Sequence, residues 1–139
     1  MSKTKLYTVA AILFLTAFGV QSCNKDTSNP PPRIDITSPV AGKEYKVNNA
    51  INVKAAAHDE GGLKSFSVSI FEVNSQGQTL LDSFQWSLDG GTDFIVDSNL
   101  ITIHNPIHPA SGITLNFNFA AADVDGNIKK VTVPVSVKP

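Results

Sequence analysis

The chain has 139 residues, of which 42% are hydrophobic, and its formal net charge is only −1. This charge balance, without any run of basic residues, argues against a nucleic-acid partner. Because the sequence holds a single cysteine, no intrachain disulfide can support a fold, and apolar burial must do so alone.

The first 22 residues have the pattern of an export signal. Lys3 and Lys5 precede an uncharged, largely apolar stretch over residues 6–22. A short basic segment followed by a short apolar one is typical of signal peptides. The stretch is shorter than the roughly 20 apolar residues that a membrane-spanning helix needs. We therefore expect residues 1–22 to be a signal peptide.

The signal ends in Val20-Gln21-Ser22-Cys23, which resembles the lipobox of bacterial lipoproteins. The resemblance implies cleavage between Ser22 and Cys23, a diacylglycerol on the Cys23 thiol, and a further acyl chain on the new N-terminus. Two or more acyl chains give stable membrane anchoring. Cys23 is therefore the predicted lipidation site. The alternative is an ordinary signal peptide beside a free cysteine, which would leave an unpaired thiol in an exported chain.

Residues 23–32 are small, polar and end in three prolines, which predicts a flexible tether that stiffens just before the fold. Lys25-Asp26 is similar to the short lysine-acidic signals that direct some Bacteroidota lipoproteins to the outer face of the outer membrane. A solvated linker accounts for these two residues equally well. We expect a lipid-anchored protein of the outer membrane, with its orientation toward the periplasm or the cell surface left open.

Residues 33–139 form one predicted domain in which apolar residues recur at every second position, as in half-buried strands. Adjacent apolar residues at Ile70 and Phe71 predict either a bulge or a strand buried on both faces. Pro134 cannot donate to a ladder and predicts a position at or near a sheet edge. The apolar sets of the expected strands are Ile34 and Ile36; Ile51, Val53, Ala55 and Ala57; Phe66, Val68 and Ile70; Leu80, Phe84, Trp86 and Leu88; Ile101 and Ile103; Ile113, Leu115, Phe117, Phe119 and Ala121; and Val131, Val133, Val135 and Val137.

Turn signals such as Glu60-Gly61-Gly62 and Asp125-Gly126-Asn127 separate these runs. Seven or eight short strands in a domain of this size predict an all-β antiparallel sandwich. We expect its core to contain the aromatic residues Phe66, Phe71, Phe84, Trp86, Phe94, Phe117 and Phe119.

Three stretches, residues 32–39, 51–59 and 120–127, resemble bacterial immunoglobulin-like and cadherin-like domains. They contribute an isoleucine-rich first strand that ends in Ser-Pro, an acidic residue after the second strand, and a Gly-Asn turn before the last strand. The closest resemblance is to single-domain Bacteroidota lipoproteins of unassigned function. It implies an immunoglobulin-like sandwich that binds or spaces. The inter-sheet cysteine pair of antibody domains is missing, which leaves the subtype open.

Acidic residues gather in two loops that such a layout places at the same end of the sandwich. Alternating oxygen ligands around a glycine resemble the start of a calcium loop, although the glutamate that closes an EF-hand loop is missing. Asp-Gly-Asn is also simply a good hairpin turn. The predicted calcium ligands are Asp59, Glu60, Asp123, Asp125 and Asn127.

A second candidate site is a polar sheet face. If the strands that bear Phe66 and Phe117 are neighbours, small uncharged side chains gather on their outer surface, where they could contact a glycan or another protein. A plain solvated face is the alternative. The residues of this predicted partner face are Ser65, Ser67, Ser69, Thr114, Asn116 and Asn118.

Neither catalysis nor a transition-metal site is indicated. The sequence has no nucleophile elbow, no His-Glu-x-x-His and no phosphate loop. His104 and His108 flank Asn105-Pro106-Ile107, where a helix that would align them is unfavourable. We therefore expect no cofactor and a non-enzymatic, lipid-anchored module that binds a protein or glycan; the alternative is a calcium-binding adhesion-type domain.

Overall fold

The computed structural model describes residues 29–104 and 111–139. The predicted signal peptide, Cys23 and residues 24–28 of the predicted tether lie outside the described residues. Within the described ranges every regular element is a strand. In chain order the eight strands are β1 (Arg33–Ser38), β2 (Glu44–Lys46), β3 (Ala50–His58), β4 (Leu63–Asn74), β5 (Gly77–Ser87), β6 (Asp93–Thr102), β7 (Ile113–Asp123) and β8 (Ile128–Lys138).

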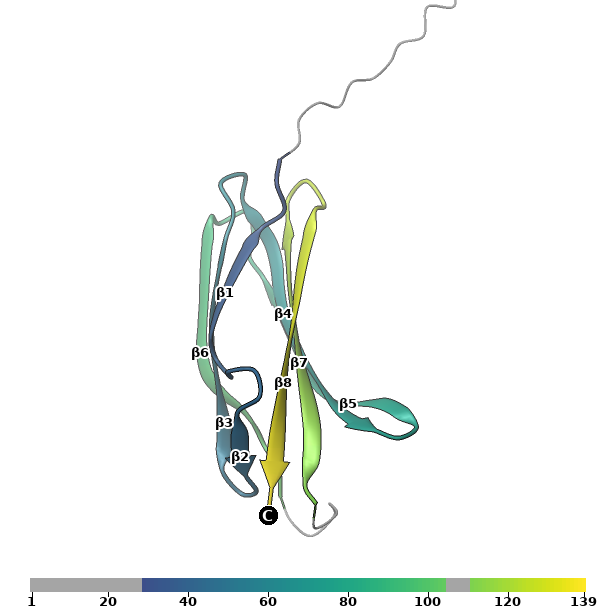
Figure 1. The fold of residues 1–139 in the computed structure, drawn as a ribbon. Helices are drawn as coiled ribbons and strands as arrows, with labels where there is room; N and C mark the ends of the chain where they lie inside the picture. Colours follow the sequence, from purple (N-terminus) through teal and green to yellow (C-terminus); the bar gives the residue numbers. More distant parts are fainter. Residues whose placement is uncertain (1–28, 105–110) are drawn as a thin grey trace, which may run out of the picture.

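The strands form two facing sheets, one of three strands in the order β1-β3-β6 and one of five in the order β2-β8-β7-β4-β5 (Figure 1). All pairings are antiparallel except that of the short β2 with β8. Strands β1, β3 and β6 take the places of strands A, B and E of an immunoglobulin-like sandwich, and β4, β5, β7 and β8 take those of C, C′, F and G. The predicted fold, an immunoglobulin-like β-sandwich of seven to eight strands, is confirmed.

The core lies between the sheets and is built by alternation, most clearly on β7. Leu115, Phe117, Phe119 and Ala121 are at most 1% exposed, while the residues between them face outward. β7 pairs with β4 on one side and β8 on the other, so it is the centre of the larger sheet. Burial of each of the larger side chains, Leu115, Phe117 and Phe119, contributes about 1.5–3 kcal/mol to folding.

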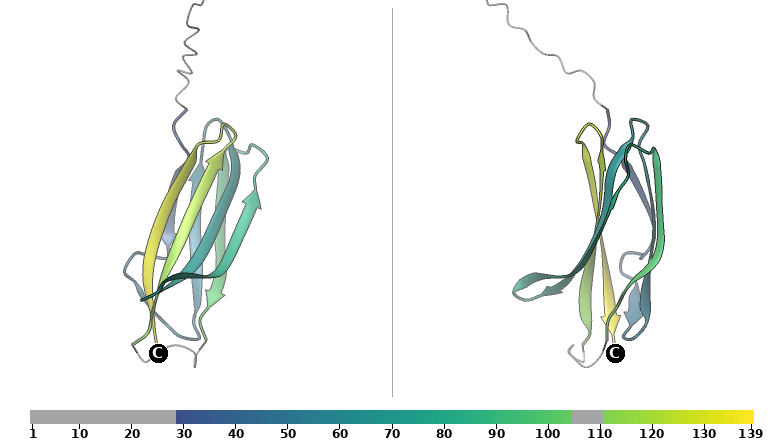
Figure 2. Two further views of the ribbon diagram at one scale, coloured as in Figure 1. Left: turned by 90° about the vertical axis from the view of Figure 1, so that its right-hand side faces the viewer. Right: turned by 180° about the vertical axis from the view of Figure 1, so that it is seen from behind.

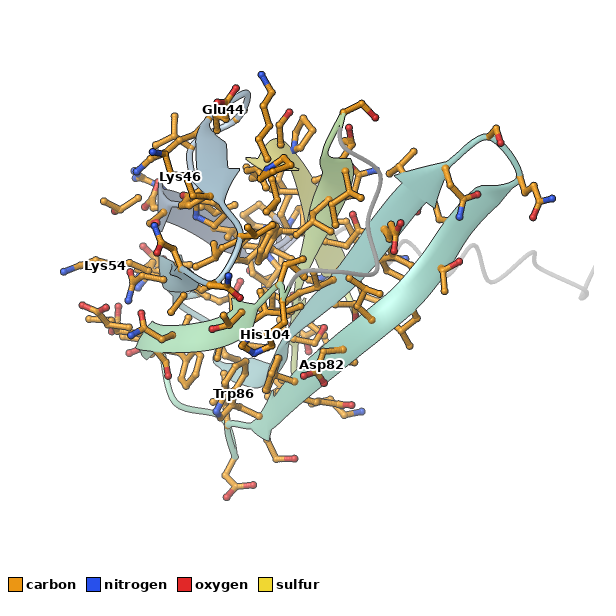
Figure 3. All side chains as sticks on the ribbon, turned by 90° about the horizontal axis from the view of Figure 1, so that it is seen from below. Glu44, Lys46, Lys54, Asp82, Trp86 and His104 are labelled. Atoms are coloured by element: carbon orange, nitrogen blue, oxygen red, sulfur yellow. The ribbon has the colours of Figure 1, made fainter. Side chains whose placement is uncertain are left out.

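An aromatic cluster joins β5 to β6, which are edge strands of opposite sheets. The ring of Phe94 lies 5.2 Å from that of Phe66 and 5.5 Å from that of Trp86. Trp86 is labelled in Figure 3. Rings at such distances and tilts attract each other beyond their buried area. These contacts close one side of the sandwich.

The β4–β5 register shifts at the adjacent apolar residues Ile70 and Phe71, but the bulge lies on β5, and β4 keeps its register with β7. Ile70 pairs with Asp82 and Phe71 with Leu80, which leaves Leu81 as the extra residue on β5. Bulges bend and twist the strand that carries them. Beyond this bulge the tip of the β4–β5 hairpin leaves the sandwich on the outer side of the five-stranded sheet (Figure 1).

Two expected core positions, Phe71 and Leu80, are wrong, and two strands differ from the expectation. Phe71 lies on the outer face of β4 rather than in the core, because Ile70 keeps the inward position opposite Phe117. Leu80 shares the outer face with Phe71 and is 54% exposed. The strand expected around Ile101 and Ile103 begins at Asp93 and ends at Thr102, and no strand was expected where β2 lies.

The expectation for Pro134 holds. β8 is the second strand from the edge, and β2 covers it only from Ser136 onward. Just before that point the carbonyl of Pro134 accepts a hydrogen bond from the amide of Gly42, at 2.8 Å. Pro134, which has no amide donor, therefore lies on a part of β8 that β2 does not cover.

Candidate binding face and acidic loop end

The predicted partner face lies on β4 and β7, which are neighbours in the five-stranded sheet. Ser69 pairs with Asn118, so these two residues meet directly. The other predicted residues are staggered along the face. Ser65 and Ser67 pair with Ala122 and Ala120, and Asn116 and Thr114 pair with Phe71 and Val73.

A groove of about 410 Å³ occupies the middle of this outer face. The left view of Figure 2 looks onto the face, where β8, β7 and β4 lie side by side. Small side chains at Ser67, Ser69 and Ala120 leave the hollow open. The described residues that line it are Ser67, Ser69, Phe71, Asn118, Phe119, Ala120, Lys130, Val131 and Thr132.

Two hydrogen-bonded side-chain pairs form one row over β8, β7, β4 and β5; Thr132, Asn118 and Ser69 of this row line the groove, and Ser83 lies just beyond it. The hydroxyls of Ser69 and Ser83 are 2.9 Å apart, and the hydroxyl of Thr132 donates to Oδ1 of Asn118 at 2.9 Å. These bonds hold the side chains in fixed positions. They leave the amide nitrogen of Asn118, with two donors, and one hydroxyl hydrogen of the serine pair available to a ligand.

Sequence reasoning found three of the groove residues, Ser67, Ser69 and Asn118, and missed Phe71, Lys130 and Thr132. Phe71 was assigned to the core because aromatic residues are usually buried. Lys130 and Thr132 lie on β8, and only the β7–β8 register places them opposite Ala120 and Asn118. The alternation of Lys130 and Thr132 with Val131 and Val133 was the one available signal.

The predicted calcium residues do converge at one end of the sandwich. The amide of Val124 donates to the carbonyl of Gly62 at 3.0 Å, so the β3–β4 and β7–β8 loops touch. Asp59 is 5% exposed and Asp123 is 0% exposed. Glu60 is exposed in the β3–β4 turn. The two loops therefore share one acidic end, as their positions after the second and sixth strands of the layout predict.

At this end the acidic side chains accept hydrogen bonds from the loops themselves. Asp59 Oδ1 accepts from the amide of Gly61 at 2.9 Å. Oδ1 of Asp123 accepts from the amide of Asn127 at 2.8 Å, and its Oδ2 accepts from the Asn127 side chain at 2.7 Å. Burial raises the pKa of Asp123, but these bonds and those from the loop backbone outweigh it, so the pKa lies below its ordinary value of 3.8.

The chain just before β1 also contacts the acidic end. The side chain of Asn29 donates to Oδ2 of Asp125 at 3.0 Å, and the backbone carbonyl of Asn29 accepts from the Asn127 side chain at 3.3 Å. A Cβ on Gly61 would lie only 2.7 Å from the Asn29 side chain. Asn29 lies within the predicted flexible tether of residues 23–32 but is fixed against the loops of the domain, so this part of the tether is less free than the sequence predicts.

The described residues hold no group of three or more His, Cys, Asp or Glu side chains close enough together to bind a metal ion. Two of the histidines point to different partners: His58 lies 2.7 Å from Asp93, and His104 lies 3.2 Å from Asn48. His108 lies outside the described residues. The described chain also includes no helix that is long and apolar enough to cross a membrane.

Comparison with known proteins adds similarity in architecture only. No protein-family model and no curated protein sequence matches the chain. Among solved structures, it is similar to fibronectin(III)-like modules of Clostridium thermocellum CbhA, with 20% identity, 76% of this chain and 96% of that one covered, and a TM-score of 0.45. It is similar to CopC from Methylosinus trichosporium OB3b, with 18% identity, 77% and 95% covered, and a TM-score of 0.44.

A third similar structure is the CARDB domain of the PF1109 protein from Pyrococcus furiosus, in complex with di-metal ions. It shares 16% identity, covers 77% of this chain and 88% of that one, and has a TM-score of 0.42. We draw no functional conclusion from similarity at this level. The class of this protein, an immunoglobulin-like β-sandwich, rests on its own strand order and pairing.

Proposed function

We propose that this protein is a non-enzymatic binding or accessory module of the bacterial envelope, anchored by lipid at Cys23. The observation that carries its binding role is the groove on the outer face of the five-stranded sheet. There an aromatic side chain, Phe71, borders a row of hydroxyl and amide groups. Ligand sites commonly combine apolar surface with a few fixed polar groups. The fold alone would not justify this assignment, since one fold hosts many functions.

The proposed anchor follows from the sequence Val20-Gln21-Ser22-Cys23 and from the position of the domain after a short tether. An exported domain with a lipid on its first residue would be held at the membrane of the envelope. We place the protein in the outer membrane on the Lys25-Asp26 pair. Its ligand would be a protein or a glycan that reaches the groove.

The anchor is tested by the substitution Cys23→Ala, with Ser22→Ala as the matched control. We expect Cys23→Ala to abolish lipid attachment and membrane partition, because the thiol that carries the lipid is gone. Ser22→Ala keeps a small residue before the cleavage site and should leave both unchanged. Mass spectrometry of the mature N-terminus and membrane fractionation measure the two effects. Normal processing and partition of Cys23→Ala would show that the anchor is assigned wrongly.

A further inference from the structure

We propose that the groove over β4, β7 and β8 binds an acidic polysaccharide, with a carboxylate of the polymer on Lys130 and a sugar ring against Phe71. The inference rests on the proposed binding function and names its ligand class. It follows from three properties of the described groove residues: their hydrogen-bonding groups, their charge, and the kind of side chain that forms the floor.

The hydrogen-bonding groups suit a ligand covered with hydroxyls. Sugar hydroxyls donate and accept, and the groove offers both kinds of partner: the amide donors of Asn118 and the hydroxyls of Ser69 and Thr132, with the hydroxyl of Ser83 next to the groove. Adjacent strands are about 4.8 Å apart, so this row over four strands is roughly 14 Å long. Such a length can follow an extended chain that lies across the strands.

The charge of the groove is opposite to that of the domain. Lys130 is the only charged side chain among the described residues that line the groove, and none of these residues is acidic. The whole chain has 12 acidic residues against 11 lysines and arginines, two of which lie in the predicted signal. A carboxylate would therefore be attracted to the groove rather than to the domain as a whole, and its contact with Lys130 would be a charge-assisted hydrogen bond.

The floor of the groove favours a glycan over a protein. Serine and alanine are depleted at the centre of protein interfaces, where aromatic residues, methionine and arginine are enriched. Here Ser67, Ser69 and Ala120 line the groove, and among the described residues Phe71 is the only aromatic outer-face residue that does so. The apolar C–H face of one sugar ring can pack on this phenyl ring, whose face carries partial negative charge.

The hairpin tip limits the outer face of the sheet at one end. Leu81 bulges from β5 directly after Leu80, the partner of Phe71. Beyond this point the tip of the β4–β5 hairpin turns outward (Figure 1). The outer face of the sheet is thereby bounded at this end rather than open along its whole length. A polymer that lies across β4, β7 and β8 would pass beside the outward-turned tip.

The test measures binding of the full chain, purified in detergent, to immobilised polygalacturonate and to the neutral polymer dextran. The decisive variant is Lys130→Gln, and its control is Lys129→Gln, an exposed neighbour on β8 that does not line the groove. Phe71→Ala is compared with Ile95→Ala, which removes an exposed apolar side chain from the other sheet. Thermal melting of each variant verifies that it is folded.

We expect polygalacturonate to bind more tightly than dextran, and this preference to fall as salt rises. Lys130→Gln should weaken binding of polygalacturonate about tenfold or more, as loss of one bond to a charged group implies. Lys129→Gln and Ile95→Ala should leave binding unchanged, and Phe71→Ala should abolish it.

If Lys130→Gln and Lys129→Gln weakened the binding of polygalacturonate equally, the inference would be overturned. Failure of the wild-type chain to bind polygalacturonate would overturn it as well. Equal binding of both polymers that is lost in Phe71→Ala but unaffected by Lys130→Gln would also overturn the acidic ligand class. In that last case the groove would still be the ligand site of the proposed function. The acidic ligand class and the proposed binding function can therefore be contradicted independently.

Discussion

Asp123 ends β7, and both oxygens of its fully buried carboxylate accept hydrogen bonds from Asn127. The amide of Asp123 in turn donates to the carbonyl of Asn127 at 3.0 Å. One side chain thus closes the β7–β8 turn from both sides. The bonds also explain why the pKa of this carboxyl is lowered although burial alone would raise it.

We predict that Asp123→Asn lowers the Tm at pH 7, because an amide cannot accept bonds at both of its terminal atoms. The pKa of the Asp123 carboxyl is lower in the folded chain than its ordinary value of 3.8. Its ionised form therefore stabilises the fold at pH values above 3.8, and this contribution is lost as the pH falls through the pKa of the folded state. The gap in Tm between wild type and Asp123→Asn should therefore narrow below pH 3.8. Melting curves from pH 7 to pH 2 measure it.

Asp35→Asn serves as the control, since Asp35 is an exposed carboxylate on the surface of β1. It should change the Tm little at any pH. Some acid sensitivity should persist in Asp123→Asn, because hydrogen bonds from His58 and Thr92 lower the pKa of Asp93, and those from Asn52 and Lys54 lower that of Asp97. A constant gap across the whole pH range would contradict the role assigned to Asp123.

At the scale of elements, the β3–β4 turn and the β5–β6 turn interlock at the acidic end. The amide of Leu63 donates to the carbonyl of Gly91 at 2.8 Å, and that of Gly90 donates to the carbonyl of Leu63 at 2.9 Å. Gly62, in the β3–β4 turn, has a φ of +106° and faces the β5–β6 turn. A Cβ on Gly62 would be 2.6 Å from the carbonyl oxygen of Gly90. The two turns can approach this closely only because Gly62 has no side chain.

We predict that Gly62→Ala lowers the free energy of unfolding by roughly 3 kcal/mol or more, because backbone strain and a clash with backbone add. The matched control is Gly42→Ala. Gly42 also has a positive φ, +75°, but no atom lies within 4 Å of its Cβ position. The control should lose only the strain, about 1–2 kcal/mol. Urea denaturation measures both variants, and equal losses would show that the close contact of the turns is unimportant.

For the whole molecule, the acidic end and the groove lie on different parts of the sandwich and have different chemistry. At the acidic end Asp59, Asp123 and Asp125 each accept hydrogen bonds from nearby N–H groups of the chain. These bonds fix the loops and the residues before β1. In the groove, donors remain available toward solvent. The groove is therefore the better candidate for a ligand site.

We predict that adding calcium to the full chain, after bound metal has been removed with a chelator, leaves the Tm unchanged. The reason is that both carboxylate oxygens of Asp123 already accept hydrogen bonds. The calcium hypothesis itself stays untested. A site filled at 100 times its dissociation constant would raise the Tm of a domain this size by roughly 10 °C or more. A shift of that size with calcium but not with magnesium, lost in Asp123→Asn, would contradict this prediction and support the adhesion-type alternative.

The sequence by itself determined the all-β class, the inward faces of β3, β7 and β8, and most turn positions. Local alternation encodes these features, because a strand with one buried face needs an apolar residue at every second position. The resemblance of the sequence to immunoglobulin-like domains also predicted that β4 lies beside β7. It predicted as well that the loops of Asp59 and Asp123 lie at the same end of the sandwich. The prediction of a lipid at Cys23 stays a prediction.

Only the tertiary structure decided which residues make the groove. Register between strands places Lys130 and Thr132 beside Ala120 and Asn118, and Ser67 on the far side of Ala120, and a local pattern does not contain that register. The outward position of Phe71 depends on which of two adjacent apolar residues meets the opposite sheet. That choice, and the bulge at Leu81 that follows it, are made by packing between the sheets, where Ile70 fills the core and Phe71 is left on the face that a ligand can reach.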